Sequence, residues 1–236
     1  MPRNENFKEY FDAIFVNSNK FTDSEFKEHS ESYDFMYRKF MPADKNAKIV
    51  DIGCGTGYFL YYLKENGYTD FMGVDISSQQ VRFIKDKFGI EAVNEDAFEF
   101  LSRNEQGFDL ITVHDVLEHI EKNRVIEFLK LIKASLRPGG QVFFRTPNMG
   151  NPMALRLRYA DFTHEFGVTE KSFYQILYMS GFRDIKLLPA KYKNLSDRLV
   201  GGFIRFVFTK LMWYQGFVAP KIMTQVIFAI AKKEEQ

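Results

Sequence analysis

The chain has 236 residues, of which 32 are basic and 31 acidic, and its net charge is +1. This length suits one α/β domain whose core folds without cross-links. The near-neutral charge gives no electrostatic basis for nucleic-acid binding, so we expect no nucleic-acid partner. The single cysteine excludes an intrachain disulfide framework, and residues 1–10 contain no apolar run. Both features predict a cytoplasmic protein.

Residues 5–40 show the apolar spacing of two amphipathic helices, with a break at 16–19. Thr22 begins a Thr-Asp-Ser-Glu run that is typical of a helix start, and Pro42 ends the second helix. Helices in front of the first strand either fold over the ligand end of the sheet as a lid or cover one sheet edge. We therefore define residues 1–42 as a helical cap.

A glycine bend follows the first predicted strand. The β-branched run Ile49–Ile52 precedes Gly53, Gly55 and Gly57, and residues 58–64 then carry apolar side chains at helical spacing. A bend without Cβ atoms lets the backbone approach a ligand closely. We expect that ligand at the carboxyl end of the strand, over the start of the helix.

The acidic residues beside the bend indicate which ligand it binds. The third glycine comes one residue earlier than in a dinucleotide fingerprint, and Asp51 would repel a pyrophosphate. The next strand, near 71–75, ends in Asp75, which is placed to bind two ribose hydroxyls. A nucleoside with a cationic tail and no diphosphate fits both carboxylates. S-adenosylmethionine is such a molecule.

Five segments resemble, in order and spacing, the motifs of class I S-adenosylmethionine-dependent methyltransferases, and the match extends over residues 30–190. They are Asp51-Ile-Gly-Cys-Gly-Thr-Gly57, Gly73-Val-Asp-Ile-Ser77, Asn94-Glu-Asp-Ala-Phe98, Phe108-Asp-Leu-Ile111 and Leu136-Arg-Pro-Gly-Gly140. The resemblance implies a Rossmann-like three-layer α/β sandwich with a seven-stranded, mostly parallel sheet. In that fold the last strand runs antiparallel between its neighbours.

The pattern along the chain agrees with this fold. We predict strands near 48–52, 71–75, 91–94, 108–113, 140–145, 184–188 and 224–231. We predict helices near 57–66, 77–88, 97–103, 122–136 and 169–180. The chain then forms one methyltransferase domain, with a cofactor-binding core at 43–190, a helical insertion at 191–222 and the last strand in 223–236.

The resemblance also implies a set of cofactor contacts. Asp96 would accept from the adenine amine, with Ile76 on one face of the ring, and Arg38 would meet the methionine carboxylate beside Tyr33 and Tyr37. Cys54 is expected to be a small packing residue of the bend. The complete predicted cofactor set is Arg38, Asp51, Gly53, Cys54, Gly55, Asp75, Ile76, Asp96, Ala97, Phe98 and His114.

Methyl transfer to a hydroxyl needs an aligned acceptor and a base for its proton. His114 and Asp115 emerge at the end of the fourth strand, where the donor methyl is expected, and are candidate catalytic residues. Glu118 and His119 are interpreted as capping or structural residues. His164 would complete a set of three possible metal ligands, but we expect no metal, because histidines five residues apart, His114 and His119, do not share one helix face and no cysteine assists them.

The segment 158–169 is polar and rich in titratable groups. It resembles a segment of methyltransferases from bacterial polysaccharide and glycan biosynthesis. The resemblance implies that His164 is a base or a sugar-hydroxyl contact. Polar acceptor-site groups would be Asn148, Arg158, Asp161 and Glu165. In the alternative interpretation, Asp161 and Thr163 hold the loop together and His164 is a satisfied loop histidine.

The chain contains 26 phenylalanines, several of them in a helical segment at 198–218. Arg205 and Lys210 leave its uncharged runs far short of the ~20 residues that a membrane span needs. The segment either lies on the inner membrane face, caps the substrate site, forms a homodimer seam or packs on its own domain.

These features predict a methyltransferase that acts on a hydroxyl of a sugar, a sugar nucleotide or a glycan. One alternative is O- or C-methylation of a small aromatic or quinone-like molecule. Another is a non-catalytic protein that binds the methyl donor. Methylation of a nucleic-acid amine is disfavoured. Enzymes of that kind carry an Asn/Asp-Pro-Pro-aromatic motif after the fourth strand, and this chain has His114 and Asp115 there instead.

Overall fold

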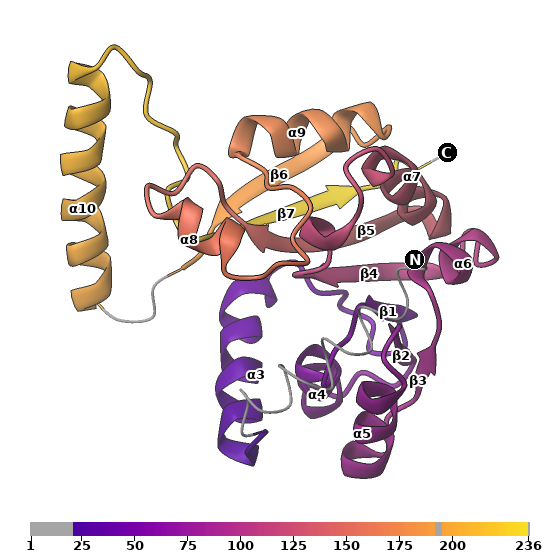
Figure 1. The fold of residues 1–236 in the computed structure, drawn as a ribbon. Coiled ribbons are helices and arrows are strands. Elements are labelled where there is room, and N and C mark those ends of the chain that lie inside the picture. The colour runs from indigo at the N-terminus through magenta and orange to yellow at the C-terminus, as the bar shows by residue number, and fades with distance from the viewer. Residues whose placement is uncertain (1–20, 192–194, 236) are drawn as a thin grey trace.

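The computed structural model describes residues 21–191 and 195–235. Its centre is a seven-stranded sheet in the order β3-β2-β1-β4-β5-β7-β6 (Figure 1). The strands are β1 (Ile49–Ile52), β2 (Phe71–Asp75), β3 (Ala92–Asn94), β4 (Phe108–His114), β5 (Leu136–Pro147), β6 (Asp184–Pro189) and β7 (Val226–Lys232).

Strand β7 runs antiparallel to both of its neighbours, β5 and β6, whereas β1 to β5 pair in parallel. The predicted fold class is thereby confirmed. One boundary differs, because the sequence predicted that the fifth strand would start near residue 140, after a Pro-Gly-Gly turn. The strand begins at Leu136 instead, which pairs with Phe108 of β4 before a register irregularity.

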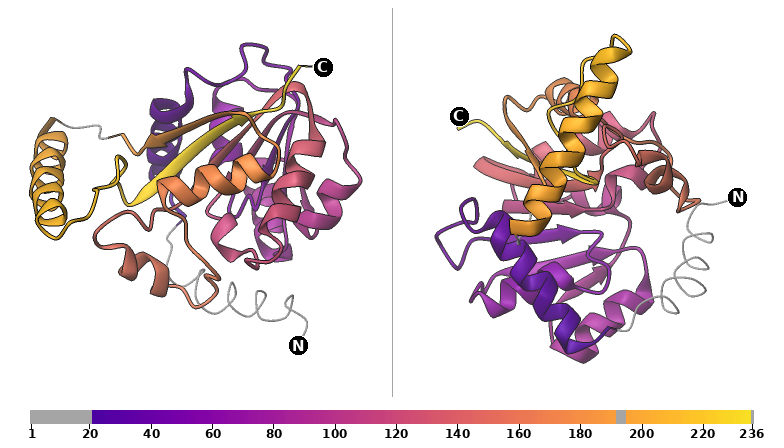
Figure 2. Two further views of the ribbon diagram at one scale, coloured as in Figure 1. Left: turned by 90° about the horizontal axis from the view of Figure 1, so that it is seen from above. Right: turned by 90° about the vertical axis from the view of Figure 1, so that its left-hand side faces the viewer.

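Helices cover both faces of the sheet (Figures 1 and 2). One core cluster joins the sheet to α3 (Asp23–Tyr37), α4 (Tyr58–Glu65) and α5 (Ser78–Phe88). The other joins it to α6 (Ala97–Ser102), α7 (Val125–Ser135) and α9 (Glu170–Met179). Alternate residues of β1 serve the two clusters, with Ile49 on one face and Val50 and Ile52 on the other. This is the three-layer arrangement that the sequence predicted.

Local signals fix several helix ends. Thr22 caps α3 as predicted, and its side chain accepts a hydrogen bond from the Glu25 backbone N–H. Thr169 and Ser172 form a capping box at the start of α9. A 3₁₀ turn, η2 (Leu117–His119), and a short helix, α8 (Ala154–Tyr159), were not predicted. The first predicted helix, before residue 16, lies outside the described residues.

Helix α10 (Leu195–Tyr214) stands apart from the sheet in Figure 1 and in the left-hand view of Figure 2. It does not pack along its length on its own domain, because most of its large apolar side chains are exposed. Among the described residues, no helix is both long and apolar enough to cross a membrane. The exposed apolar residues of α10 are Leu199, Val200, Phe203, Ile204, Phe206, Val207, Leu211, Trp213 and Tyr214.

Candidate cofactor and active site

The glycine bend between β1 and α4 adopts a backbone that other residues avoid. Gly53, Gly55 and Gly57 have φ angles of 68°, 55° and 87°, in the left-handed region. The Gly53 and Cys54 N–H groups donate to the Val74 carbonyl, at 2.8 and 3.1 Å. A Cβ atom on Gly53 would lie 2.2 Å from Val116 Cγ2. The bend is therefore held against β2 with no room for side chains.

Cys54 is buried, and its sulfur packs against Gly73 on β2. A Cβ atom added to Gly73 would meet this sulfur at 2.6 Å. This contact agrees with the prediction of a packing role for the thiol.

Asp51 lies at the carboxyl end of β1, directly before the bend. Its carboxyl group is buried and accepts a hydrogen bond from Thr112 Oγ1 at 2.7 Å. Burial raises the pKa of Asp51 to about 7, although the Thr112 hydrogen bond opposes this effect. The carboxylate form is costly here, which suits a site that binds a cationic group.

Asp75, at the end of β2, lies directly beside the bend. Its two oxygens accept from the Gly55 N–H at 2.9 Å and the Ser77 N–H at 2.8 Å. The Asn94 side chain, at the end of β3, donates to the carbonyls of Asp75 and Ile76. Thus Asp75 and Ile76 sit on a backbone fixed by the neighbouring strand.

The residues that were predicted to contact adenine, which follow the third strand, lie at the start of α6. Asp96 is the N-cap of that helix, and its side chain accepts from the Phe98 and Glu99 N–H groups. Ala97 and Phe98 follow in the first turn, with Phe98 packed on Phe128. Asp96 therefore has a structural use in addition to its proposed adenine contact.

His114 is buried at the end of β4 among the aromatic residues of the cap. Its Nε2 atom lies 2.9 Å from the Tyr37 hydroxyl, and Nδ1 lies 3.9 Å from Asp51 Oδ1. Tyr33 and Phe59 pack around the ring. Burial lowers the pKa of His114 to about 3, so the ring stays neutral near pH 7. Helix α3 thus reaches the ligand end of the sheet, where the sequence analysis considered a lid.

Two arginines differ from the prediction. The Arg38 side chain is 78% exposed and pairs with Asp34 one helical turn earlier. Arg145, which the sequence analysis left without a role, lies opposite His114 in the β4–β5 register and pairs with Asp115 at 2.8 Å. Asp115 has a φ of 53°, a left-handed conformation that a non-glycine residue rarely adopts. An arginine and a strained carboxylate therefore meet at the expected position of the donor methyl.

The segment after α8 returns to the end of β4. The Glu165 N–H donates to the Glu118 carbonyl at 2.8 Å, which brings His164 against His119 with ring centroids 4.8 Å apart. Glu118 is buried, and its carboxylate accepts from Thr146 Oγ1 at 3.0 Å. Burial raises the pKa of Glu118 to about 8. The sequence analysis did not place Glu118 and His119 beside His164.

Three of the predicted acceptor-site residues form contacts within the fold. Arg158 donates to the carbonyls of His164 and Glu165, and Asp161 accepts from the N–H and hydroxyl of Thr163. Asn148 is fully buried, with its amide bonded to the backbone of residues 150, 222 and 224. These contacts match the alternative interpretation, in which polar residues hold the loop together.

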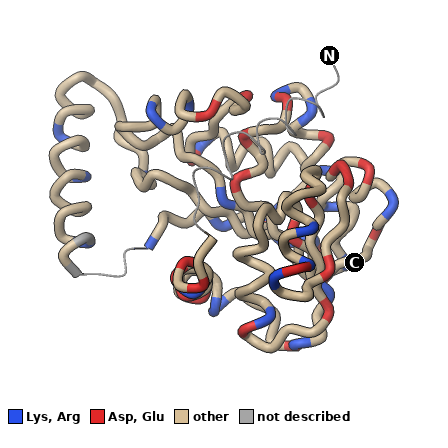
Figure 3. The backbone as a smooth tube through the Cα atoms, turned by 60° about the horizontal axis from the view of Figure 1, so that its bottom comes forward, with Lys and Arg blue, Asp and Glu red and all other residues tan. Residues whose placement is uncertain are grey.

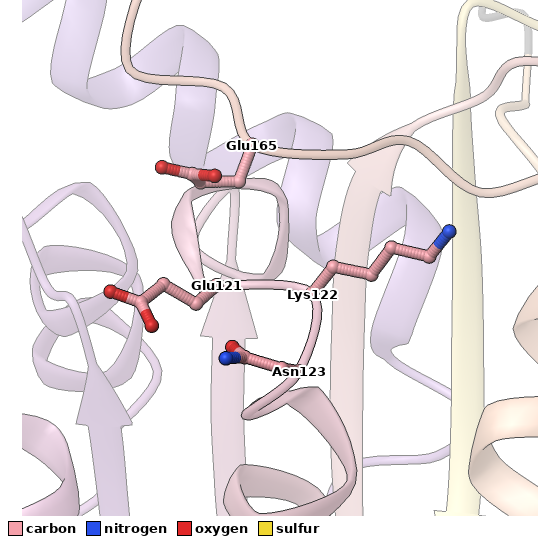
Figure 4. Close-up of a pocket in the computed structure, with 4 residues that line it drawn as sticks. All are labelled: Glu121, Lys122, Asn123 and Glu165. Atoms are coloured by element: carbon pink, nitrogen blue, oxygen red, sulfur yellow. The ribbon is translucent and has the colours of Figure 1, made fainter.

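A cavity of 740 Å³ opens beside this loop (Figure 4). Its lining consists of Glu121, Lys122, Asn123 and Glu165. Figure 4 shows Glu165 on the loop above and the other three residues on the turn before α7. All four lining residues carry carboxylate, amide or ammonium groups that form hydrogen bonds with a hydroxyl-rich ligand, although apolar atoms of these side chains contribute the larger part of the exposed lining.

The donor side fits S-adenosylmethionine. Asp51 offers a carboxyl group to a cation, and Asp75, the residue predicted to bind the ribose, lies beside the bend and accepts from the Gly55 N–H. Among the described residues, His114 Nδ1 and Gln80 Oε1 are buried polar atoms without a hydrogen-bond partner. Gln80 Oε1 lies beside Gly55. Buried unpaired polar atoms at this edge are expected where a polar ligand completes the site.

The fold and the cofactor edge define a class I S-adenosylmethionine-dependent methyltransferase. A family profile described as "Methyltransferase domain" matches residues 22–187. The chain therefore belongs to this methyltransferase family, as its motifs predicted.

Comparison with individual proteins gives the same class. A solved S-adenosylmethionine-dependent methyltransferase from Archaeoglobus fulgidus is 27% identical, with a TM-score of 0.66, over 94% of this chain and 100% of that one. The ubiquinone biosynthesis O-methyltransferase of Coxiella burnetii is 31% identical over 108 residues, which are 44% of this chain and 45% of that protein. The tRNA U34 carboxymethyltransferase of Nautilia profundicola is 28% identical over 165 residues, 65% of this chain and 53% of that protein. The chain thus spans about half the length of these curated relatives.

Proposed function

We propose that this protein methylates a hydroxyl group of a sugar, a sugar nucleotide or a glycan. The observation that carries the proposal is the open depression lined by the polar residues Glu121, Lys122, Asn123 and Glu165, beside the loop that holds His164. A hydroxyl-rich acceptor would form hydrogen bonds with carboxylate, amide and ammonium groups there, whereas a flat apolar molecule would leave them unpaired.

On the donor side, the role of the chain is to position S-adenosylmethionine. S-adenosylmethionine supplies a methyl group that its sulfonium already activates. The bend at 53–57 would hold the nucleoside close to the backbone, Asp75 would bind the ribose hydroxyls, and Asp51 would face the cationic tail. Arg38 points away in an exposed ion pair, so we assign the methionine carboxylate to the Arg145 side of the site.

On the acceptor side, we assign Asp115 as the base. Its carboxylate is fixed by Arg145 at the end of β4, and burial raises the pKa of Asp115 above its ordinary value. The pKa of His114, about 3, makes that imidazole a weak base, so His114 is a positioning residue that links Tyr37 to the Asp51 end of the site. Proton removal by a positioned base contributes roughly 10²–10⁴-fold.

The proposal is tested by incubating the purified protein with labelled S-adenosylmethionine and separate panels of sugar nucleotides, lipid-linked glycans and phenols. We expect one methyl group on a sugar product, identified by mass spectrometry. Labelled phenols alone would contradict the sugar assignment. Donor binding without any methylated product would instead support a non-catalytic donor-binding protein.

Methylation of a quinone-like molecule is the second candidate. It is favoured by the name of the Coxiella burnetii relative, a ubiquinone biosynthesis O-methyltransferase. Substitutions in the 150–170 loop discriminate the two functions. A sugar site would lose activity at polar positions, whereas a quinone site would lose it mainly at aromatic positions.

We further propose that α10 brings a cytoplasmic enzyme to an anionic membrane face. Its exposed side chains combine aromatic and aliphatic groups with the cations Arg198, Arg205 and Lys210, and Figure 3 shows basic residues along the helix. Basic, aromatic helices of this kind lie in the lipid headgroup region. A membrane location would suit lipid-linked glycans.

A vesicle-flotation assay tests this role of α10. With vesicles of phosphatidylcholine and phosphatidylglycerol, we expect Phe203→Ser with Trp213→Ser to weaken binding by about tenfold or more. The matched control, Tyr174→Ser with Tyr178→Ser, changes exposed aromatic residues of α9 and should bind as the wild type does. Unchanged flotation of the α10 variant, or a dimer in light scattering that this variant dissociates, would contradict the membrane role.

A further inference from the structure

Three side chains with metal-binding atoms converge beside the acceptor edge. Glu118 and His119 come from η2, and His164 comes from the loop after α8. One potential ligand atom from each residue lies within 4.8 Å of the other two. Two imidazoles and a carboxylate are a common donor set for first-row transition metals.

The contacts of His164 orient its ring for metal binding. Its Nδ1 atom lies 3.1 Å from the Leu157 carbonyl. Because a carbonyl oxygen can only accept, the ring proton is on Nδ1 and the lone pair is on Nε2. A metal-binding histidine typically donates its second nitrogen in this way.

His119 and Glu118 have comparable supporting contacts. Thr163 Oγ1 donates to Asp161 Oδ1 and lies 2.9 Å from His119 Nδ1, so this hydroxyl oxygen accepts from the ring. One Glu118 oxygen accepts from Thr146. Within the described residues, Glu118 forms no ion pair with a lysine or arginine. Burying a carboxylate is costly without a cation beside it.

The backbone holds the two halves of the cluster together. The Glu165 N–H donates to the Glu118 carbonyl, and Arg158 donates to the carbonyls of His164 and Glu165. The loop that carries His164 is thus fixed against η2 before any ligand binds. A pre-organised site binds more tightly, since less freedom is lost on binding.

From this convergence we propose a divalent transition-metal site formed by Glu118, His119 and His164. Ligand atoms on one Zn²⁺ lie about 2.0–2.2 Å from the metal and therefore roughly 3–4 Å from one another. The cluster would close by about 1 Å on binding. Three protein ligands leave a position open for a substrate oxygen, as in catalytic rather than structural zinc sites.

The open position suggests a role, which rests on the proposed function. A cation there would bind the acceptor hydroxyl and lower the pKa of that hydroxyl. The hydroxyl proton would pass to the Asp115 carboxylate, and the oxygen lone pair would form the new bond to the methyl group as the methyl–sulfur bond of S-adenosylmethionine breaks. The electron pair of that bond stays on sulfur, and S-adenosylhomocysteine leaves. His164 would then be a metal ligand rather than the base that the sequence resemblance implied.

Metal binding is tested without any methylation. The full-length protein, freed of metal with a chelator, is titrated with Zn²⁺ in a calorimeter and with Co²⁺ in a spectrophotometer. We expect one ion per chain, with Co²⁺ giving the visible absorption of a low-coordinate nitrogen and oxygen site. His164→Asn and Glu118→Gln should each weaken Zn²⁺ binding by at least about 10–100-fold. His29→Asn, which changes a histidine outside the cluster, is the matched control and should bind normally.

Absence of Zn²⁺ and Co²⁺ binding, or equal binding by wild type and His164→Asn, would overturn the site. If His164→Asn does not fold, Thr163→Ala provides the decisive variant, because it leaves all three ligands in place, removes the hydroxyl that supports His119 and also bonds Asp161, and should weaken Zn²⁺ binding about tenfold. If Zn²⁺ binds but the metal-free enzyme turns over normally, the metal site is retained and its proposed role in acceptor activation is contradicted.

Discussion

The two ends of strands β4 and β5 carry the same pair of side chains in different surroundings. At the amino end, Asp109 pairs with Arg137 at 2.7 Å and also accepts from the Lys48 N–H. At the carboxyl end, Asp115 pairs with Arg145 at 2.8 Å. The first pair joins neighbouring strands at the register irregularity that follows the Phe108–Leu136 pairing.

The second pair has a left-handed aspartate and stands between the aromatic cap, the buried Asp51 and the loop of His164. The two pairs are similarly exposed, so what sets the second apart is the strained aspartate and the buried groups around it, features that accumulate where a site is organised for binding and chemistry. Under the proposed function, the same chemical pair serves stability at one end of the sheet and catalysis at the other. Variants matched across the two ends can test this distinction.

The largest expected effect is on turnover. Asp115→Asn keeps the shape of the side chain and tolerates the left-handed backbone, but it removes the proposed base. We expect kcat to fall by roughly 10²–10⁴-fold with little change in cofactor affinity. Asp109→Asn, the control at the other end of β4, should lower the free energy of unfolding by about 1 kcal/mol and leave kcat unchanged. Equal kcat losses in the two variants would remove the functional assignment.

The glycine bend offers a second matched pair. Gly53→Ala adds a Cβ that meets Val116, whereas Gly89→Ala, at φ 62°, has no atom within 4 Å of its Cβ. Left-handed strain alone costs about 1–2 kcal/mol of unfolding free energy, and overpacking adds a further ~1–3 kcal/mol in Gly53→Ala. We expect Gly53→Ala to bind S-adenosylmethionine at least about 100-fold more weakly and Gly89→Ala to bind normally, as measured by calorimetry. Normal binding by Gly53→Ala would show that the cofactor does not use the bend.

The carboxylate of Asp75 is tested against that of Asp70 at the start of the same strand. Asp75→Asn removes the charge proposed to bind the ribose hydroxyls and should weaken cofactor affinity by about 10–100-fold. Asp70 is exposed, and Asp70→Asn should have no measurable effect. Equal affinities of the two variants in a calorimetric titration would contradict the ribose assignment.

The most gradual effect, at most about tenfold per pH unit, is a pH dependence of cofactor affinity. The pKa of Asp51 is about 7, so below that pH the free protein holds this side chain protonated. A cationic ligand binds the carboxylate form, and its binding releases the proton. Affinity for S-adenosylmethionine should therefore rise with pH by up to about tenfold per unit below pH 7 and level off above it. Asp51→Asn should flatten this profile, and a wild-type profile that is flat from pH 5 to 7 would refute the assignment.

Much of the donor side could be predicted from the sequence, because its groups lie close together along the chain. Asp51 and Gly53 belong to one strand and its turn, and Asp75 lies at the end of the next strand. Parallel pairing then brings these strand ends together without any further information.

The acceptor side depended on contacts between distant segments. The expectation of no metal rested on the spacing of His114 and His119 and gave no position to His164, whereas the structure brings His164 beside Glu118 and His119 and leaves His114 outside the cluster. The sequence alone does not predict this contact between His164 and the Glu118–His119 turn, because it does not give the conformation of the loop that carries His164. Arg145 was missed although a signal existed, because pairing the predicted β4 and β5 strands in register places it opposite His114.

The most direct test of the account is a calorimetric titration of the wild-type protein with S-adenosylmethionine and, separately, with NAD⁺. We predict one binding site per chain for S-adenosylmethionine and no binding of the dinucleotide, because Asp51 stands where a diphosphate would lie. Binding of NAD⁺, or no heat with S-adenosylmethionine, would contradict the cofactor assignment on which the proposed function depends.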